Sequence, residues 1–480
     1  MNDFPAEAGR DGVPDIRPSM PESQPMIPQR LVELHGWGRT ASSMSHLAQI
    51  DSLADAVSAL RTAGGGRGVA PRGLGRSYGD AAQNAGGLTL DLTKLNQILA
   101  VDAASEPPTV TVQAGVSLDA LMRTLLPFGL WVPVLPGTRQ VTIGGAIAAD
   151  VHGKNHHVDG AFSRHVEAFE LALAGGELRE VTPAQPLFAA TAGGMGLTGV
   201  ITRVRLRLTP VTSAYMRVTT TRAGDLDALM GSMRERDAGY RYSVAWIDCL
   251  KRGAAMGRGV LLRGEHATAE ELPPRQRRKP LAQTSRPVLG VPGIVPSGVL
   301  NSTVARAFNE AYFRRAPAQE HIGLEPIGPY FHPLDAVAAW NRLYGPRGFV
   351  QYQAVVPDAE GEAIRTLLER VSGAGMSSFL AVLKRFGEGS GMLSFPMAGW
   401  TLALDIPVGA SDLARRLDEL DDVVVAAGGR VYLAKDARVR PELLPVMYPD
   451  LERWREVQRS ADPEGRMRSD LARRLGLVGG

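Results

Sequence analysis

The chain has 480 residues, of which 44% are hydrophobic and 21% charged, as in an ordinary globular protein. Because this length exceeds one typical hydrophobic core, we expect two or three domains. The formal net charge of +3 is too small to indicate nucleic-acid binding, and the single cysteine, Cys249, excludes an internal disulfide.

Membrane-spanning and secretory signals are both absent from the sequence pattern. No apolar run reaches the roughly 18 residues that a transmembrane helix needs. The N-terminal segment contains acidic residues and prolines but no apolar core of a signal peptide. We therefore expect a protein that is cytoplasmic or peripheral at the cell membrane, with residues 1–30 as a disordered tail.

Short helices, short strands and glycine-rich loops alternate in the first half of the chain, which predicts an α+β fold. The first of these loops occupies residues 71–80, and its glycines do not match the G-x-G-x-x-G dinucleotide fingerprint. The apolar periodicity predicts helices over 54–62 and 118–126, and strands over 69–70, 88–92, 110–114, 166–173, 177–181 and 200–208.

A second loop, residues 136–157, contains a Pro-Gly turn, a Gly pair, several alanines and three histidines. Glycine and alanine let a backbone approach a ligand closely, and such turns can present N–H groups to a diphosphate. His152 is followed by a glycine, which leaves its ring accessible. Two interpretations stay open from these residues alone: a cofactor loop ending in a catalytic histidine, or a glycine-rich turn before a polar surface loop.

A third loop contains Gly194, Gly196 and Gly199, which do match G-x-G-x-x-G. A dinucleotide fingerprint must open a helix whose N-terminus holds the pyrophosphate. Residues 200–208 instead alternate as a strand, so we exclude a Rossmann domain. A third glycine loop at the same cofactor remains open.

The pattern changes after a boundary near Thr209–Pro210. Residues 251–296 look like a loop around the basic segment Arg275–Lys279, which is either a solvated loop or a flap attracted to anionic lipid or a phosphorylated substrate. Beyond it, alternation predicts strands over 241–248, 349–356, 379–384 and 400–406, with helices over 362–371 and 411–420. We expect an α+β domain inserted into the first.

Polar residues mark three of the later elements. Gln351 and Gln353 share one face of their strand, which suits sugar hydroxyls or a plain solvated face. Lys435 ends a predicted strand beside Asp436, where a surface ion pair is the simpler interpretation. A basic helical tail follows over residues 447–475.

Several of these motifs together resemble the vanillyl-alcohol-oxidase (PCMH-type) FAD-binding superfamily, including its closing Asp-Pro motif at Asp462-Pro463. Within it, the chain resembles the family of decaprenylphosphoryl-β-D-ribose oxidases, from about Leu34 to Leu475. The most specific matches are Arg72–Asp80, Pro136–His157, Phe331–Asp335, Gln351–Gln353 and Ala434–Asp436.

The resemblance implies a two-part FAD-binding domain, residues 31–210 and 429–480. A substrate domain on an antiparallel sheet, residues 211–428 with the flexible basic loop at about 251–296, would separate the parts. Arg76 stands where many relatives carry a flavin-linking histidine, so the FAD should be non-covalent. The implied FAD-binding residues are Arg72, Gly73, Leu74, Gly75, Arg76, Ser77, Tyr78, Gly79, Asp80, Gly137, Thr138, Thr142, Ile143, Gly144, Gly145, Ala149, Asp150, Val151, His152, Gly153, Ile201 and Tyr432.

By the same resemblance, His152 and Lys435 form the catalytic pair. A histidine suits proton acceptance near pH 7, and a fixed cation suits the developing charge of a reduced flavin. Lys384 would hold a lipid phosphate, or exchange roles with Lys435. The implied substrate-binding residues are Tyr78, Trp246, Phe331, Gln351, Gln353, Lys384, Phe386, Thr401, Ala403 and Asp405, and no metal is implied.

The sequence departs from the family at three of these positions. Ala403 replaces the cysteine that covalent nitroaromatic inhibitors attack, Thr401 replaces an asparagine, and Phe331 replaces a tyrosine. The cysteine is not needed for hydride transfer, so activity is still expected, with resistance to thiol-trapping inhibitors.

The resemblance implies FAD-dependent oxidation of the 2-hydroxyl of a polyprenylphosphoryl-β-D-ribose to a 2-keto sugar. This is the first half of an epimerisation that makes an arabinose donor for cell-wall arabinan. The implied partners are a separate NAD(P)H-dependent short-chain reductase, a quinone or oxygen as electron acceptor, and a membrane surface. Two alternatives stay open: an FAD-dependent oxidase of a soluble sugar alcohol or aldonolactone, and a flavin- or lipid-binding protein without turnover.

Overall fold

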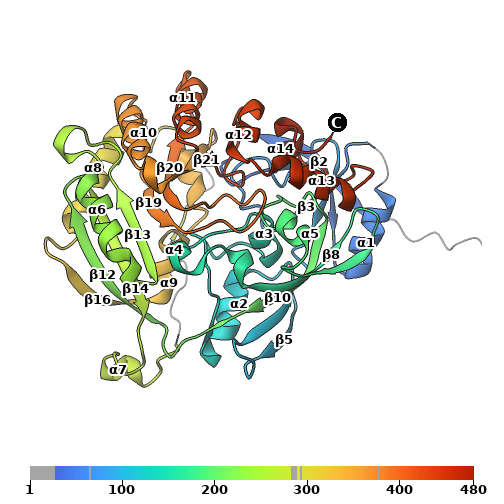
Figure 1. The fold of residues 1–480 in the computed structure, drawn as a ribbon, viewed down its shortest axis with the longest axis horizontal. Helices are drawn as coiled ribbons and strands as arrows, with labels where there is room; N and C mark the ends of the chain where they lie inside the picture. The colour runs from blue at the N-terminus through green and yellow to red at the C-terminus, as the bar shows by residue number, and fades with distance from the viewer. Residues whose placement is uncertain (1–26, 64–65, 283–288, 292–294, 377, 480) are drawn as a thin grey trace, which may run out of the picture.

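The structure is a computed structural model that describes residues 27–63, 66–282, 289–291, 295–376 and 378–479. Within these residues the strands form three main sheets, and helices pack around them (Figure 1). The fold is α+β, as the sequence predicts. Helices α1 (Leu53–Thr62) and α2 (Leu118–Leu125) start at serine caps, because Ser52 and Ser117 accept hydrogen bonds from the backbone N–H groups of Asp55 and Ala120.

The first sheet is mixed, with the order β1-β2-β4-β3. β1 and β2 pair antiparallel, whereas β4 pairs parallel with both β2 and β3. Loop 71–80 begins in the last strand of this sheet and leaves it toward the centre of the molecule. The strands are β1 (Gln29–His35), β2 (Ser42–Gln49), β3 (Val69–Arg72) and β4 (Leu88–Asp91).

The second sheet is antiparallel, with the order β5-β6-β10-β8-β9. Val204 and Leu206 of its central strand lie in an apolar core with Val110 and Val112, and α2 and α3 pack against that core. Its strands are β5 (Ile98–Asp102), β6 (Thr109–Gln113), β8 (Val166–Ala172), β9 (Leu178–Val181) and β10 (Val200–Arg207); the associated elements are β7 (Leu130–Trp131), β11 (Thr209–Pro210), α3 (Ile143–Ala148), α4 (His156–Asp159) and α5 (Pro186–Thr191).

The third sheet is antiparallel and lies within residues 215–431, in the order β16-β12-β14-β13-β19-β20-β18-β21. One face packs against α6, α10 and α11, because alternate residues such as Tyr352 and Ala354 are apolar and join that core. The strands are β12 (Tyr215–Ala223), β13 (Tyr242–Ile247), β14 (Gly259–His266), β16 (His321–Pro326), β18 (Phe349–Pro357), β19 (Ala381–Phe386), β20 (Gly399–Pro407) and β21 (Arg430–Val431). The helices of that face are α6 (Leu226–Arg236), α10 (Glu362–Gly373) and α11 (Leu413–Ala426).

The remaining elements connect these sheets or close the chain. The C-terminal helices return beside β3, and the backbone N–H of Val69 bonds the carbonyl of Arg466 at 2.7 Å (Figure 1). These elements are α7 (Pro274–Arg277), β15 (Leu289–Gly290), α8 (Ser302–Arg315), α9 (Ile327–Phe331), β17 (Val337–Ala338), α12 (Leu444–Met447), α13 (Leu451–Ala461) and α14 (Asp470–Leu475).

Three local predictions need correction or a limit. Residues 251–296 are not one loop, because β14 lies within them and pairs on both sides, with β12 and β13. The tail predicted over 1–30 lies outside the described residues up to residue 26, and Gln29 and Arg30 belong to β1. Lys435 does not end a strand, since β21 stops at Val431, and Asp436 pairs with Arg474 rather than with Lys435.

Candidate active site

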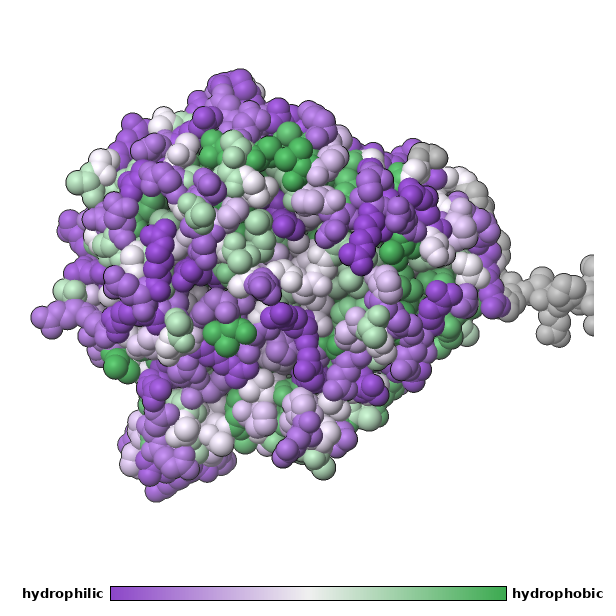
Figure 2. Space-filling view, in the orientation of Figure 1, coloured by the Kyte–Doolittle hydropathy of each residue, from purple (hydrophilic) through white to green (hydrophobic). Residues whose placement is uncertain are grey.

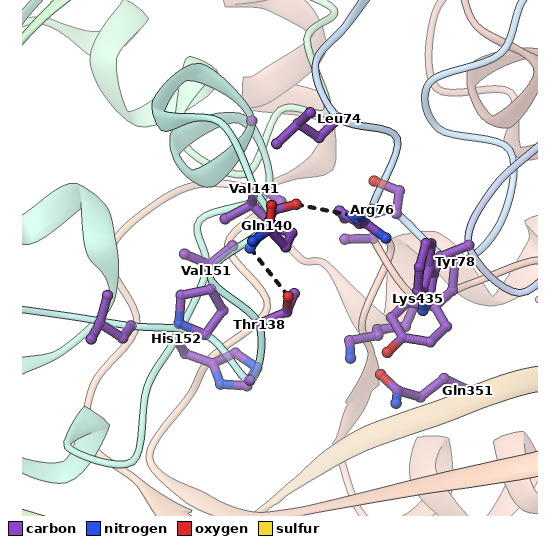
Figure 3. A pocket seen from close by; sticks show the side chains of 18 of the residues that line it. Leu74, Arg76, Tyr78, Thr138, Gln140, Val141, Val151, His152, Gln351 and Lys435 are labelled. Carbon is purple, nitrogen blue, oxygen red and sulfur yellow. Dashed lines mark hydrogen bonds between the residues drawn. The ribbon is translucent and has the colours of Figure 1, made fainter. Parts of the chain in front are cut away.

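A cavity of about 750 Å³ lies between the glycine-bearing loops and the face of the third sheet that α6, α10 and α11 leave open. Its walls come from all three glycine loops predicted from the sequence, together with strands β13, β14, β18, β19 and β20. In Figure 3, Val151 and His152 lie on one side of the cavity, and Tyr78, Gln351 and Lys435 lie on the other. The cavity therefore joins the first two sheets to the third.

The loops approach the cavity closely because their glycines leave room for neighbouring atoms. A Cβ on Gly73 would lie 2.3 Å from Oγ1 of Thr142, and Gly75 has a φ of +62°. Gly137 lines the cavity, and a Cβ there would meet no protein atom within 4 Å, so this space is open to a ligand. Such a backbone cradle fits an elongated dinucleotide such as FAD.

Arg76 is fixed by contacts from two other segments. Its guanidinium lies 3.8 Å from the ring centroid of Trp37, and its Nε donates to the carbonyl of Gln140 at 3.0 Å (Figure 3). Lys435 Nζ lies 4.3 Å from the ring centroid of Tyr78. These contacts anchor the loop that carries Arg76 and Tyr78 along the cavity wall.

His152 lies in the cavity wall beside two strands of the third sheet. His152 is 7% exposed. Its Nε2 lies 3.1 Å from Nε2 of Gln353, and its Nδ1 lies 3.2 Å from Nζ of Lys384. Burial holds its pKa well below the usual value, and the positive charge of Lys384 lowers the pKa further. At neutral pH His152 is therefore uncharged and able to take a proton.

Three partly buried lysines line the cavity: Lys154, Lys384 and Lys435. Burial lowers the pKa of Lys435, and the carboxyl group of Asp405 opposes that effect. Burial likewise raises the pKa of Asp405, whose Oδ1 accepts a hydrogen bond from Gln351. With pKa values of about 8, Lys154 and Lys435 stay positively charged at neutral pH, so an anionic ligand would be favoured beside them.

The depressed pKa of Lys384 predicts a pH-dependent stability. Burial, then the charges of Lys435 and Lys154, lower this pKa from 10.5 to about 7. Between these values the unfolded chain keeps a proton that the folded chain releases, so folding becomes more favourable as the pH rises. Lys384→Met should therefore raise the melting temperature more at pH 7 than at pH 10. An equal difference at both pH values would contradict a depressed pKa.

The structure brings most of the predicted FAD-binding residues to the cavity. All of them line it except Gly79, Asp80, Ile143 and Asp150, each of which is next to a lining residue in the sequence. Asp150 is fully buried and accepts hydrogen bonds from Ser163 N, Ser390 Oγ and Ser394 Oγ, so it fixes the turn before His152.

Among the predicted substrate-binding residues, seven line the cavity: Tyr78, Trp246, Phe331, Gln351, Gln353, Lys384 and Ala403. Gln351 and Gln353 are both buried, which excludes the solvated face that their pattern also allowed. Phe386, Thr401 and Asp405 do not line the cavity but contact residues that do. Phe386 packs against His152, with 4.6 Å between ring centroids.

Sequence reasoning missed several lining residues. Lys154 belongs to the second loop, but no pattern in the sequence singles it out, and Trp37 comes from the turn after β1. Gly196 and Gly199 of the third loop also line the cavity, so the open alternative of a third cofactor loop is favoured. The match of this loop to G-x-G-x-x-G could have indicated a cofactor-binding loop, although the loop does not belong to a Rossmann domain.

The fold and the cavity define an FAD-dependent oxidoreductase. Residues 44–182 match the family described as FAD binding domain, and residues 411–475 match D-arabinono-1,4-lactone oxidase. The chain is 43% identical over 459 residues to decaprenylphosphoryl-β-D-ribose oxidase of Mycolicibacterium smegmatis, covering 94% of this chain and 99% of that relative. It is 26% identical to alditol oxidase of a Streptomyces species, over 91% and 96% of the two chains.

The chain therefore belongs to the decaprenylphosphoryl-β-D-ribose oxidase family. It is an oxidoreductase of CH–OH groups with FAD as its cofactor. Among the described residues, no helix is long and apolar enough to cross a membrane.

Proposed function

We propose that this protein oxidises the 2-hydroxyl of a polyprenylphosphoryl-β-D-ribose to a 2-keto sugar. One observation carries the proposal beyond family membership: the lysine-rich part of the cavity continues into an apolar part. The apolar part is lined by Val244, Trp246, Leu262, Phe308, Tyr312, Phe379 and Val382. A ligand with both an anionic group and a long apolar chain uses both parts, whereas a soluble polyol has no use for the second.

The residues of the cavity divide the chemistry between them. FAD, when bound, supplies the hydride acceptor. His152 is uncharged and takes the hydroxyl proton, while Gln351 and Gln353 present amides to the sugar hydroxyls. Lys435 stabilises negative charge that develops in the reaction, and Lys154 lies between the second loop and α9, where its Nζ contacts the carbonyl of Tyr330.

The substrate class is tested by mixing the FAD-loaded protein anaerobically with a short-chain polyprenylphosphoryl ribose. Loss of the oxidised-flavin absorbance at about 450 nm is the expected result. Free xylitol or an aldonolactone serves as the parallel substrate, because the similarity to an alditol oxidase and to a lactone oxidase makes these the natural alternatives. Bleaching by the soluble alcohol alone would reject the lipid-linked substrate.

The reaction has further participants in this proposal. A separate NAD(P)H-dependent short-chain reductase reduces the keto sugar to complete the epimerisation for arabinan and cell-wall synthesis, and a quinone or oxygen reoxidises the flavin. Helix α7 projects from the body of the protein and carries Arg275 and Arg277 on a hydrophilic surface (Figure 2). This projection supplies peripheral contact with anionic lipid.

The FAD is expected to be non-covalent. The predicted covalent position holds Arg76, whose guanidinium is stacked on Trp37 and cannot form the linkage that a histidine forms. Acid precipitation of the holoprotein should release all of the yellow chromophore into the supernatant. Colour retained on the precipitated protein would contradict this.

Resistance to thiol-trapping inhibitors has a structural reason. Cys249 is 1% exposed and does not line the cavity, and burial raises the pKa of its thiol to about 12. Ala403 lines the cavity directly opposite Gln353 in the β18–β20 pair. After turnover with a nitroaromatic inhibitor, the intact mass of the wild-type protein should stay unchanged, whereas Ala403→Cys should gain one adduct. An adduct on the wild-type protein away from Cys249 would contradict this prediction.

A further inference from the structure

A chain of hydrogen bonds connects Thr401, outside the cavity, to His152 and Lys384 inside it. Thr401 Oγ1 donates to the carbonyl of Ala354 at 2.9 Å and lies 3.1 Å from Nε2 of Gln353. The same Nε2 lies 3.1 Å from Nε2 of His152, and Nδ1 of His152 lies 3.2 Å from Nζ of Lys384. Thr401 and Gln353 are 1% and 2% exposed, so water does not compete for the hydrogen bond between them.

Counting hydrogens fixes the direction of every bond in this chain. A hydroxyl has one hydrogen, and Thr401 gives it to Ala354, so toward Gln353 it can only accept. The Gln353 atom that faces Thr401 is then the amide NH₂, and its second hydrogen points at Nε2 of His152. Nε2 must accept, which leaves the ring proton of neutral His152 on Nδ1.

The partner of that ring proton is Lys384. An ammonium group has donors and no acceptor, so a protonated Nδ1 can bond Nζ only when Lys384 is an uncharged amine. We propose that Thr401 is a positioning residue: it orients the Gln353 amide so that His152 rests with its proton on Nδ1 and Lys384 rests as the amine that accepts it.

The surroundings of the pair favour this arrangement. The titratable groups that act on Lys384 are Lys435 and Lys154, and those that act on His152 are Lys384, His156 and Lys435. None of these neighbours carries negative charge. An additional proton on the resting pair would therefore face burial and like charges at once, which agrees with the lowered pKa of both members.

The inference deepens the proposed function and rests on His152 as the proton acceptor. A bound substrate hydroxyl takes the place of the Gln353 N–H at Nε2 of His152, because that nitrogen has a single lone pair. As the substrate O–H bond breaks, its proton then forms a bond with this Nε2. The Nδ1–H bond breaks in turn, and that proton forms a bond with Nζ of Lys384. FAD would accept the hydride from the same sugar carbon, so the proton's positive charge ends on Lys384 and His152 returns to neutral.

The resting tautomer can be measured without any substrate. The test uses FAD-loaded protein labelled with ¹⁵N-histidine, and the His152 signals are those missing from His152→Ala. Two-bond ¹H–¹⁵N correlations should show a pyrrole-type Nδ1 and a pyridine-type Nε2. A pyrrole-type Nε2 would overturn the inference while leaving the substrate class untouched, and a failed substrate assay would not change the tautomer result.

The role of Thr401 is tested by two variants, one that removes its hydroxyl and one that keeps it. Thr401→Val keeps the shape without the hydroxyl, so Gln353 can turn over and His152 should shift to the Nε2–H form. The pH midpoint of flavin reduction should then move by about one unit, the size expected for one hydrogen bond. Thr401→Ser keeps the hydroxyl and should restore both the wild-type tautomer and the midpoint.

Two outcomes would overturn the positioning role: wild-type tautomer and midpoint in Thr401→Val, or the same shift in Thr401→Ser. FAD content and melting temperature identify a variant that is merely unstable. If Thr401→Val does not fold, Thr401→Ala takes its place in the same comparison, and the wild-type spectrum still decides the tautomer.

Discussion

Replacing His152 with alanine should slow flavin reduction by the proposed substrate by ~10²–10⁴-fold, the usual contribution of a positioned general base. His152 lines the cavity, and burial together with the neighbouring Lys384 holds its pKa low, so its ring is neutral and can accept a proton. Alanine leaves the hydroxyl proton without an acceptor. Stopped-flow absorbance under anaerobic conditions measures the rate directly.

The matched control for this variant is His157→Ala. His157 belongs to the same loop but does not line the cavity, and its Nε2 lies 3.0 Å from the carbonyl oxygen of Tyr240. In the His157→Ala variant, the substrate should reduce the flavin at the wild-type rate. If His152→Ala binds FAD normally and is reduced as fast as this control, His152 is not the base, and the proton step must be assigned elsewhere.

The parts of the site with local periodicity were predictable from the sequence. Gln351 and Gln353 are two residues apart on a strand, so they had to share a face, and the structure places both in the cavity wall. Likewise, apolar and polar residues alternate over 200–208 with the period of a strand and not of a helix, which excluded a Rossmann helix after Gly199. In these cases the short-range pattern determines the geometry.

Contacts between distant segments left no such signal. Strand β14 looked like part of a polar loop because it contains Arg263 and Glu265, but Arg263 is fully buried and donates to Asp237 and Ser232. A buried ion pair hides an internal strand behind surface-like composition. Trp37 also left no signal in the sequence, because folding alone brings its partner Arg76 close to it.

The C-terminal helix supplies the clearest long-range contact that the sequence could not predict. Arg474 of α14 donates to both carboxylate oxygens of Asp80, at 2.9 and 2.8 Å, and pairs with Asp436 at 2.8 Å. Asp80 ends the first glycine loop, and Asp436 follows Lys435. The two segments are in direct contact, since a Cβ on Gly79 would lie 1.9 Å from the carbonyl oxygen of Asp436.

Replacing Arg474 with methionine should therefore destabilise the protein and weaken FAD binding together. Asp436 is 5% exposed, so removing Arg474 leaves a buried carboxylate with the backbone N–H groups of Arg438 and Val439 but without its paired guanidinium, which costs ~3 kcal/mol. The loss falls on the segments that carry Arg76, Tyr78 and Lys435 into the cavity. Melting temperature should drop in the FAD-free protein, and titration with FAD should show a higher dissociation constant.

Arg415→Met is the control that separates this effect from the loss of any surface arginine. Arg415 pairs with Asp412 and Glu419 on α11, but its side chain is 63% exposed. Removing such a solvated pair should change stability by less than ~1 kcal/mol and leave FAD affinity unchanged. Equal losses in the two variants would mean that Arg474 does not couple α14 to the cavity. A loss confined to Arg474→Met, in both stability and FAD affinity, makes the C-terminal helix part of what holds the cofactor loops in place.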